Sequence, residues 1–383
     1  MEQAIFERTE GALAFADGRA TNEVAMATDV PTLLARYGVM HPLVVSRSGL
    51  ARSGVDAEMA RRSMPYVQFA DFTPNPTAEQ VLAGLAVYEG EGCDGILSIG
   101  GGSAIDLAKA IKALGGCAPS AALEARLKAP QPMDAVHVAL PTTAGTGSES
   151  THFATIYLDG KKYSVADAAL LPEAAILDAS QLASLPQAER AATFLDALCH
   201  AIESYWSRRS SAASRAYSET AIGLLMANST AYLQGDAAAA GAVMAAANLA
   251  GRAINLTTTT AAHAMCYQLT LRYGLSHGHA AAVCLPAAWR YLLAHAADDG
   301  ELAARLADLS HVVCGEEAAA EDGCRAFEAL LAQAALDESW LPTDAGELDV
   351  LAASVNVQRL QNFPAELTTA DLRELYRQTL RMA

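Results

Sequence analysis

The chain has 383 residues, of which 52% are hydrophobic, and its formal net charge is −17. This length exceeds what one ordinary core supports, so it predicts a globular protein of two domains. The acidic balance excludes nucleic acid and anionic membranes as expected partners, because both require a basic surface.

The amino terminus gives no sign of export. Residues 1–15 carry acidic residues around short apolar runs and lack the basic and apolar regions of a secretory signal. No uninterrupted apolar run approaches transmembrane length. The seven cysteines are odd in number and form no CxxC pair, which fits reduced thiols in a cytoplasm. We therefore expect a cytoplasmic protein without a membrane partner.

Short β-rich runs alternate with helical patterns from residue 31 to about 180. The runs are PLVVS at 42–46, YVQFA at 66–70, GILSI at 95–99, VHVAL at 136–140 and AAILD at 174–178. Such alternation predicts a mostly parallel, helix-covered sheet. After about residue 185 only helical periodicity remains. The expected organisation is an α/β domain over residues 1–181 and an all-α domain over residues 182–383.

The first candidate binding loop follows the third of these strands. In GILSIGGGSAIDLAKAIKAL, at 95–114, a buried strand leads into three glycines and a helix that starts at Ser103 and carries Asp106 and Lys109. The glycines let the backbone approach a ligand, and the helix amino terminus offers free N–H groups to a phosphate. The segment is neither a GxGxxG fingerprint nor a Walker A loop, so a tight turn without a ligand is the alternative.

A second loop, LPTTAGTGSES at 140–150, follows the next strand with hydroxyls and glycines that suit a ribose or a diphosphate. Two such loops at strand carboxyl ends lie where open α/β sheets bind cofactors. The run GTGSE does not have the glycine spacing of a GxSxG nucleophile elbow, which excludes a hydrolase of that type.

The segment FLDALCHAIESYWS, at 194–207, places Asp196 and His200 four residues apart in an otherwise apolar stretch. On a helix both side chains share one face. Two interpretations are open: a carboxylate that orients a buried histidine, or half of a metal site. The remaining histidines without a motif, His41, His137, His295 and His311, are expected at the surface or at helix caps.

The motifs GGGSAIDLAKA, PTTAGTGSE and DALCHAIESYWS, followed by His263 and His277, occur in the order and approximate spacing of a known family. Over residues 30 to 300 the chain resembles the iron-containing (group III) alcohol dehydrogenases. The resemblance implies a Rossmann-like NAD(P) domain and a helical metal domain, the architecture shared with dehydroquinate synthase. It implies that Asp196, His200, His263 and His277 bind the metal, a donor set that suits Fe²⁺ or Zn²⁺.

The resemblance also implies a cofactor site. Where NAD-preferring relatives end a strand with aspartate, this chain has Arg47 after Ser46, so NADPH is expected to be accepted and preferred. A solvated Arg47 with NADH still used is the alternative. The expected cofactor-binding residues are Arg47, Asn75, Gly100, Gly101, Gly102, Ser103, Asp106, Thr142, Thr143, Ser148 and Lys162.

The catalytic residues depart from the family pattern at one position. Many members carry a second histidine four residues after the third metal ligand, where this chain has Tyr267. Tyr267 or His279, through water, is expected to take over the proton route.

The runs THFATIYLDGKKYS and HGHA resemble the subgroup that reduces phosphonoacetaldehyde to 2-hydroxyethylphosphonate. That dianion requires local positive charge, for which Arg252, Lys161, Arg272 and His279 are candidates, with Thr257 to Thr260 as neutral donors. A generalist reductase of small aldehydes such as lactaldehyde, or a dehydrogenase of diols such as propanediol, is the alternative. A sugar-phosphate cyclase and a non-catalytic metal-binding protein fit less well. A homodimer is expected.

Overall fold

The computed structural model describes residues 22–26, 29–296, 299–341 and 346–382. The chain divides into two compact units. An α/β unit holds the described residues up to Thr143 together with Gly147–Ser184. A helical unit holds Ala144–Thr146 and the described residues from Leu185 onward. The α/β unit ends at Ser184, a few residues after the boundary predicted at residue 181. The sequence pattern did not separate the short Ala144–Thr146 segment from the first domain.

The α/β unit is built on a six-stranded sheet in the order β1-β8-β5-β4-β2-β3. Every pair is parallel, with Leu43 opposite Ile96 and Ile99 opposite Leu140. The strands are β1 (Glu23–Met26), β2 (Pro42–Val45), β3 (Val67–Phe69), β4 (Gly95–Gly100), β5 (Val136–Pro141) and β8 (Ala174–Leu177). All five strands expected from the sequence are present, and the parallel α/β fold is confirmed.

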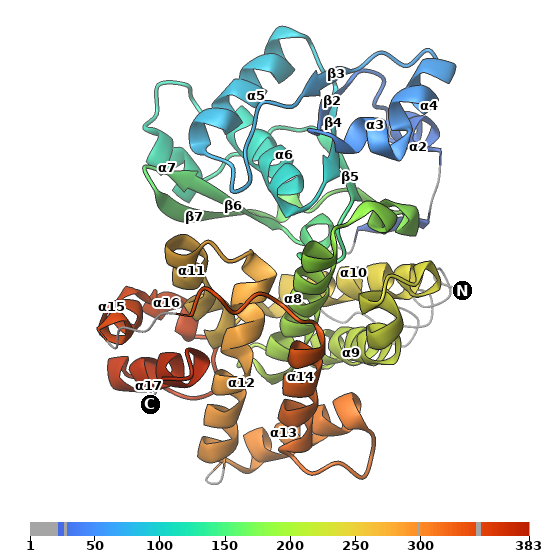
Figure 1. The fold of residues 1–383 in the computed structure, drawn as a ribbon. Helices are drawn as coiled ribbons and strands as arrows, with labels where there is room; N and C mark the ends of the chain where they lie inside the picture. The colour runs from blue at the N-terminus through green and yellow to red at the C-terminus, as the bar shows by residue number, and fades with distance from the viewer. Residues whose placement is uncertain (1–21, 27–28, 297–298, 342–345, 383) are drawn as a thin grey trace. The chain divides into compact units, whose positions relative to one another are not determined.

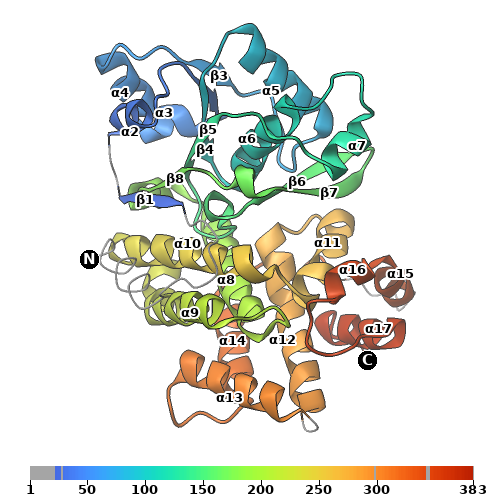
Figure 2. The same ribbon diagram turned by 180° about the vertical axis from the view of Figure 1, so that it is seen from behind.

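Helices cover both faces of this sheet (Figures 1 and 2). Side chains alternate along each strand, so Leu43 and Val45 enter the core under α5, α6 and α7, while Val44 enters the core under α2, α3 and α4. These helices are α2 (Val30–Arg36), α3 (Gly49–Ser53), α4 (Val55–Arg61), α5 (Ala78–Gly90), α6 (Gly102–Gly115) and α7 (Leu123–Lys128). The arrangement is a doubly wound sheet. His137, expected at the surface or at a helix cap, is instead fully buried on β5, with Nε2 2.8 Å from the Ser98 hydroxyl.

Two elements were not expected from the sequence. One is β1, at the edge of the sheet. The other is an antiparallel hairpin of β6 (Phe153–Leu158) and β7 (Lys161–Ala166). Its turn residues, Asp159 and Gly160, both have positive φ, 50° and 71°, as a two-residue type I′ turn requires.

The helical unit contains no strand within its described residues, so the expected all-α second domain is confirmed. Its long helices are α8 (Gln187–Trp206), α9 (Ala212–Leu233), α10 (Ala240–Thr257), α11 (Ala261–Tyr273), α12 (His277–His295), α13 (Gly300–Cys314) and α14 (Asp322–Gln333). Three shorter ones follow: α15 (Glu347–Ser354), α16 (Val357–Leu360) and α17 (Thr369–Thr379). Capping boxes start α9 at Ser211 and α17 at Thr368.

Helix α8 lies at the centre of this unit and packs against α9, α10 and α12. Its residues from Phe194 to Trp206 are all buried, which explains the apolar sequence around Asp196. The stretch Ala237–Thr257, which includes α10, is long and apolar enough to cross a membrane by composition, but 83% of its 18-residue apolar window is buried within the fold. That burial is what a core helix shows.

Candidate active site

Helix α8 carries three buried polar side chains on one face. Asp196, His200 and Glu203 are four and three residues apart, so a helix with 3.6 residues per turn places them in one row. Their exposed fractions are 2%, 5% and 0%. Because buried charges require partners, this row predicts further polar groups opposite it.

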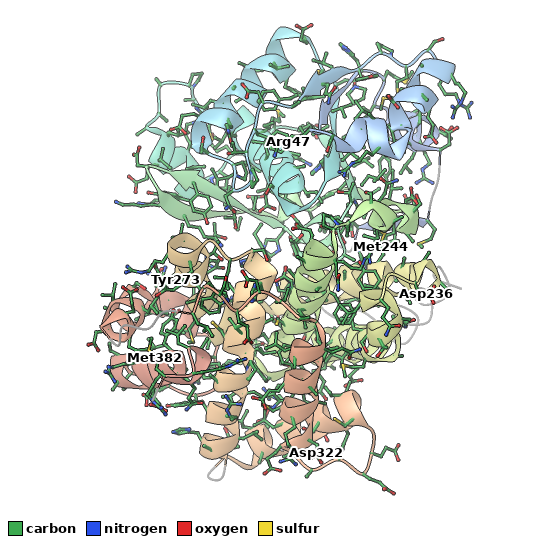
Figure 3. The ribbon with its side chains drawn as sticks, viewed as in Figure 1. Arg47, Asp236, Met244, Tyr273, Asp322 and Met382 are labelled. Carbon is green, nitrogen blue, oxygen red and sulfur yellow. The ribbon has the colours of Figure 1, made fainter. Side chains whose placement is uncertain are left out.

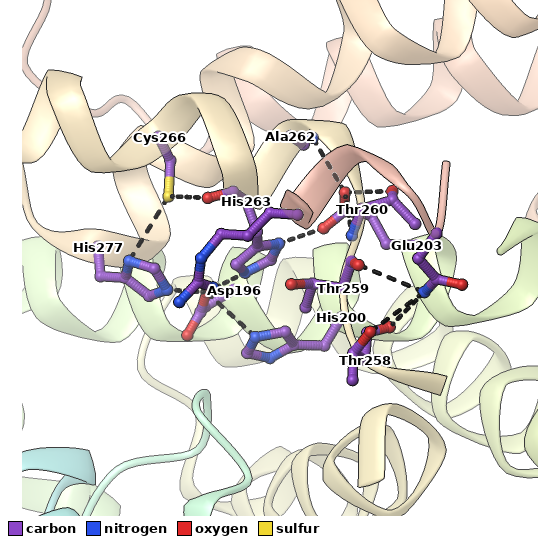
Figure 4. Close-up of polar contacts among 12 residues, drawn as sticks. Asp196, His200, Glu203, Thr258, Thr259, Thr260, Ala262, His263, Cys266 and His277 are labelled. Atoms are coloured by element: carbon purple, nitrogen blue, oxygen red, sulfur yellow. Dashed lines mark hydrogen bonds and ion pairs between the residues drawn. The ribbon is translucent and has the colours of Figure 1, made fainter. Parts of the chain in front are cut away.

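Those groups come from two further helices, α11 and α12. His263 lies in the first turn of α11, and His277 is the first residue of α12. One ligand atom from each of Asp196, His200, His263 and His277 lies within 4.8 Å of the others. Asp196 Oδ1 is 3.4 Å from Nε2 of His263 and 4.0 Å from Nε2 of both His200 and His277. Figure 4 shows the three rings directed at this carboxylate.

The spacing suits a metal ion, because ligands bound at about 2.0–2.1 Å in tetrahedral geometry lie about 3.4 Å apart. The outer nitrogens of the rings support the same interpretation. Nδ1 of His200 lies 3.3 Å from the Gly145 carbonyl oxygen, Nδ1 of His263 bonds the Glu203 carboxylate, and Nδ1 of His277 lies 3.6 Å from Cys266 Sγ. An acceptor at Nδ1 places the proton there and leaves Nε2 free to ligate.

Glu203 is the functional residue that the sequence analysis missed. Its Oε2 accepts from His263, and its Oε1 accepts from the backbone N–H of Thr260 at 3.1 Å and of Ala262 at 3.0 Å. The Thr260 hydroxyl also donates to Oε1 and itself accepts from the indole of Trp206. A third polar residue on the face of Asp196 and His200 was the signal that the sequence held.

The electrostatics of the cluster follow from burial and mutual contact. Burial alone would raise the pKa of Asp196, but the surrounding imidazoles outweigh it and lower that pKa. Burial lowers the pKa of His200. Burial would also lower the pKa of His263, yet Glu203 and Asp196 together raise it to about 9. The two carboxylates thus favour positive charge at this point, as a site for a divalent cation requires.

Gly278 sets how closely α12 approaches α8. A Cβ at this position would lie 2.1 Å from the Ala192 carbonyl oxygen and 2.7 Å from Asp196 Cβ. Since no side chain fits there, the glycine lets His277, its neighbour, come within reach of Asp196.

The two expected catalytic residues lie in different surroundings. The ring of Tyr267 stacks on that of His277, with centroids 5.8 Å apart and an interplanar angle of 18°. His279 instead packs edge-on against Trp340 at 6.0 Å, and burial lowers its pKa. Residues 277 and 279 are two apart on α12, so their side chains point about 200° apart. The structure therefore brings Tyr267, and not His279, against a member of the cluster.

In the α/β unit, three expected cofactor residues form the turn from β4 into α6. Gly100 ends the strand, Gly101 caps the helix and Gly102 begins it, one residue earlier than expected. A Cβ on Gly100 would lie 2.7 Å from that of Ala104, so the turn requires glycine. The Ser103 hydroxyl accepts from the backbone N–H of Asn75 at 3.3 Å, which places these two residues side by side.

The expected cofactor-binding residues after β2 and β4 lie where the strand order of the sheet reverses. Strand β2 has β3 on one side and β4 on the other, and the carboxyl ends of β2 and β4 lead to Arg47 and Gly101 respectively. Open α/β sheets bind ligands at this point. Thr142, which follows β5, donates its backbone N–H to the Gly100 carbonyl at 3.0 Å, and Thr143 lies against Gly101. These contacts join the two loops at the carboxyl ends of β4 and β5.

Asp106, Ser148 and Lys109, in contrast, bond to one another. The Asp106 carboxylate accepts from the Ser148 hydroxyl and from the backbone N–H of Thr155 at 2.8 Å. Lys109 Nζ donates to the Ser148 hydroxyl, the Thr151 hydroxyl and the Phe153 carbonyl, each at 3.0 Å. Lys162, on β7, adds its charge near Asp106. These polar side chains fasten the second loop to α6, a role that the sequence analysis did not assign to them.

Arg47 is exposed just after β2 (Figure 3). The neighbouring Ser46 is fully buried: its hydroxyl donates to the Ile99 carbonyl at 2.8 Å and accepts from the Leu50 N–H at 2.9 Å. The Ser46 hydroxyl next to Arg47 is therefore engaged within the fold. Ser46 joins β2 to β4, and Arg47 alone faces outward.

Two of the expected anion-binding residues are engaged elsewhere. Arg272 forms an ion pair with Glu347, with bonds of 3.0 and 2.9 Å. Arg252 is 3% exposed and donates to the Asn248 side chain at 3.0 Å. Lys161 is exposed at the start of β7. Thr257 ends α10 and Thr258 to Thr260 lead into α11, and the Asn362 amide donates to the carbonyl of Thr257 at 2.7 Å.

Comparison with known proteins agrees with this fold. The family description "Iron-containing alcohol dehydrogenase" matches residues 20–179, and "Fe-containing alcohol dehydrogenase family, C-terminal" matches residues 190–380. The chain belongs to the iron-containing alcohol dehydrogenase family.

Three similar proteins are named for three different substrates. The chain is 39% identical over 241 residues to the phosphonoacetaldehyde reductase of Streptomyces viridochromogenes, in a match that covers 60% of each protein. It is 31% identical to the lactaldehyde reductase of Escherichia coli, covering 67% of this chain and 69% of the relative. The structure of a 1,3-propanediol oxidoreductase superposes with a TM-score of 0.85 at 26% identity, covering 94% of this chain and 99% of the other. The match to the first relative thus spans less than two thirds of its length.

Proposed function

We propose that the protein is a metal-dependent, NAD(P)H-linked reductase that converts phosphonoacetaldehyde to 2-hydroxyethylphosphonate. The observation that carries the reductase class is the buried cluster of Asp196, His200, His263 and His277. The similarity to a phosphonoacetaldehyde reductase supports the particular substrate.

The residues of the cluster fit a divalent metal, Fe²⁺ or Zn²⁺, because they supply one carboxylate and three imidazoles whose Nε2 atoms converge. A metal held there supplies Lewis-acid polarisation of the aldehyde, and the nicotinamide supplies the hydride. Within the chain, Glu203 fixes the tautomer of His263, the Gly145 carbonyl that of His200, and Gly278 the approach of His277. The protein thus contributes placement and needs no nucleophile.

For the proton that completes the alcohol, we propose Tyr267 as the nearer of the two expected groups. Its ring stacks on His277, and its hydroxyl oxygen accepts a hydrogen bond from Arg359 at 2.8 Å. A phenol can donate its proton to an alkoxide, and a guanidinium at its oxygen stabilises the phenolate that this step leaves. His279, which packs against Trp340, remains the second candidate, acting through water.

For the cofactor, we propose that NAD(P)H binds along the carboxyl ends of β2, β4 and β5. Gly100, Gly101, Gly102 and Ser103 would take the diphosphate at the start of α6, with Asn75, Thr142 and Thr143 beside it. Arg47 would meet the adenosine ribose and its 2′-phosphate, so NADPH is expected to be preferred. We also propose that the enzyme acts in the cytoplasm and that it is a homodimer. Light scattering on the purified protein would test the dimer.

The first experiment is metal analysis of the wild type and of His263→Ala, with His311→Ala, an exposed histidine on α13, as the control. We expect one divalent ion per chain in the wild type and the control, and none in His263→Ala. An unchanged stoichiometry in His263→Ala would contradict the metal assignment.

The second experiment measures kcat/KM for phosphonoacetaldehyde, propanal and lactaldehyde with the metal-loaded enzyme. A generalist reductase is the alternative, favoured by the similarity to the lactaldehyde reductase and to the propanediol oxidoreductase. If propanal equals the phosphonate in kcat/KM, the specific substrate is wrong while the metal-dependent reductase stands.

A further inference from the structure

The cluster of Asp196, His200, His263 and His277 is not equally buried on all sides. Three of its members are at most 5% exposed, whereas 38% of the His277 side chain is exposed. A ligand that approaches the cluster from solvent therefore meets the His277 side.

Two side chains extend outward from His277 as a stack. The Tyr267 ring lies nearly parallel to the imidazole. The Arg359 guanidinium in turn lies over Tyr267, with Cζ 4.7 Å from the ring centroid, and its Nη1 donates to the phenol oxygen. Both Tyr267 and Arg359 are partly exposed. A guanidinium is thus fixed against the ring that stacks on His277, the most accessible residue of the cluster.

The charge balance of the site makes this cation significant. The carboxylates of Asp196 and Glu203 together balance a divalent ion, and the chain as a whole carries a net charge of −17. Attraction for an anionic substrate must therefore come from another positive group. Among the described residues, no carboxylate lies within ion-pair distance of Arg359, in contrast to Arg272, which is paired with Glu347.

Arg359 is also held in place by its surroundings. It lies on the short helix α16, which Asn356 caps. Three residues later, the Asn362 side chain donates to the Thr257 carbonyl and accepts from the backbone N–H of Arg209 at 3.1 Å. The Nε and Nη2 atoms of Arg359 have no hydrogen-bond acceptor among the described residues. A preorganised guanidinium with two donors left over suits bidentate contact with a phosphonate or a similar oxyanion.

We propose that Arg359 is the specificity-determining residue of the site and binds the anionic end of the substrate while the aldehyde lies at the metal. This inference rests on the proposed reductase function and narrows its substrates to short aldehydes that carry a phosphonate-like anion. Arg359 itself was not singled out from the sequence, because it lies far along the chain from the motifs.

The test compares Arg359→Met, Arg359→Lys and Arg272→Met, each loaded with metal, against the wild type. The readouts are kcat/KM for phosphonoacetaldehyde and for propanal, metal content, and the Kd of 2-hydroxyethylphosphonate by calorimetry. In Arg359→Met we expect the ratio of phosphonoacetaldehyde to propanal kcat/KM to fall at least about tenfold, mainly through KM, and the Kd to rise by a similar factor, as for the loss of a charge-assisted contact. Arg359→Lys should recover part of the kcat/KM ratio and part of the affinity for 2-hydroxyethylphosphonate. Arg272→Met should keep the wild-type ratio.

The outcomes separate the inference from the function on which it rests. An equal loss with both aldehydes, together with a loss of metal, would show that Arg359 only positions Tyr267 and His277, and the inference would fall. An unchanged ratio and Kd in Arg359→Met would also overturn it. If the wild type reduces neither aldehyde with NADH or NADPH, the proposed function fails, but the Kd of 2-hydroxyethylphosphonate still decides whether Arg359 binds this anion.

Discussion

The Glu203 carboxylate bonds Nδ1 of His263, and the opposite nitrogen of the same ring lies 3.4 Å from Asp196 Oδ1. One ring therefore joins two buried carboxylates that both come from α8. The first carboxylate orients the imidazole, and the second would share a metal ion with it in the proposed site. The contact with His263 explains why α8, an otherwise apolar helix, contains the fully buried Glu203.

The relationship predicts the effect of Glu203→Gln. The amide would present an N–H to Nδ1 of His263 and reverse the tautomer, so that Nε2 carries the proton and cannot ligate. We expect metal affinity, measured by competition with a chelator, to fall about 10- to 100-fold. Glu219→Gln, at an exposed position on α9, is the matched control and should bind metal as the wild type does. Wild-type affinity in Glu203→Gln would show that the contact does not orient the ligand.

Gly278→Ala should damage the site without touching a ligand. The added Cβ would meet the Ala192 carbonyl oxygen at 2.1 Å, so α12 must move away from α8 and take His277 with it. Overpacking of this kind costs about 1–3 kcal/mol. We expect a lower Tm and a lower metal content.

The control for this substitution is Gly223→Ala on α9, where a Cβ meets nothing within 4 Å. Glycine within a helix is unfavourable relative to alanine by about 0.5–1 kcal/mol, so this variant should be slightly more stable than the wild type. If the two variants melt alike, the close approach at Gly278 has no energetic importance.

Arg47→Ala tests the cofactor preference. Because Arg47 is exposed just after β2, its guanidinium can meet a 2′-phosphate, and its loss should lower kcat/KM for NADPH by about tenfold or more while NADH changes little. Arg52→Ala, an exposed arginine on α3, should leave both values as they are. A wild-type preference of about tenfold for NADH, about 1.4 kcal/mol, would contradict the assignment before any variant is made.

Lys109 gives the pH prediction. Burial lowers the pKa of this amine in the folded protein to about 8, from an ordinary value of 10.5. Between these values the unfolded chain holds a proton that the folded chain has released, so the contribution of Lys109 to stability rises with pH across this window. The Tm of the wild type minus that of Lys109→Met should therefore increase as the pH is raised through the window. For Lys128→Met, which removes an exposed lysine of α7, the same difference should stay constant.

The sequence predicted those parts of the fold whose patterns are strong. Five strands were recognised, and four of them, β2, β4, β5 and β8, are buried and apolar along almost their whole length, as strands of a parallel sheet covered on both faces are. Strand β1 was missed because its four residues, EVAM, are exposed or only partly buried. The hairpin was missed although Asp159 and Gly160 form its turn, because β7 has only Val165 buried and shows little alternation.

For the site, spacing alone paired Asp196 with His200, and the resemblance supplied His263 and His277. Sequence reasoning could not tell which polar residues of the loops face a ligand. Ser46, Asp106 and Ser148 have the residue types that a cofactor site uses, but the same hydroxyls and carboxylates also satisfy buried backbone and side-chain partners. Only the packed structure distinguishes the two uses.

The short segment Ala144–Thr146 belongs to the helical unit although it interrupts the α/β unit in the chain. Its Gly145 carbonyl lies 3.3 Å from His200 Nδ1, and a Cβ on Gly145 would collide with Thr193. A gene fragment that begins at Leu185 would therefore encode the helices but omit this carbonyl, leaving His200 without its outer partner. Anyone wishing to express the metal domain alone would have to supply this loop as a separate peptide or graft it by circular permutation.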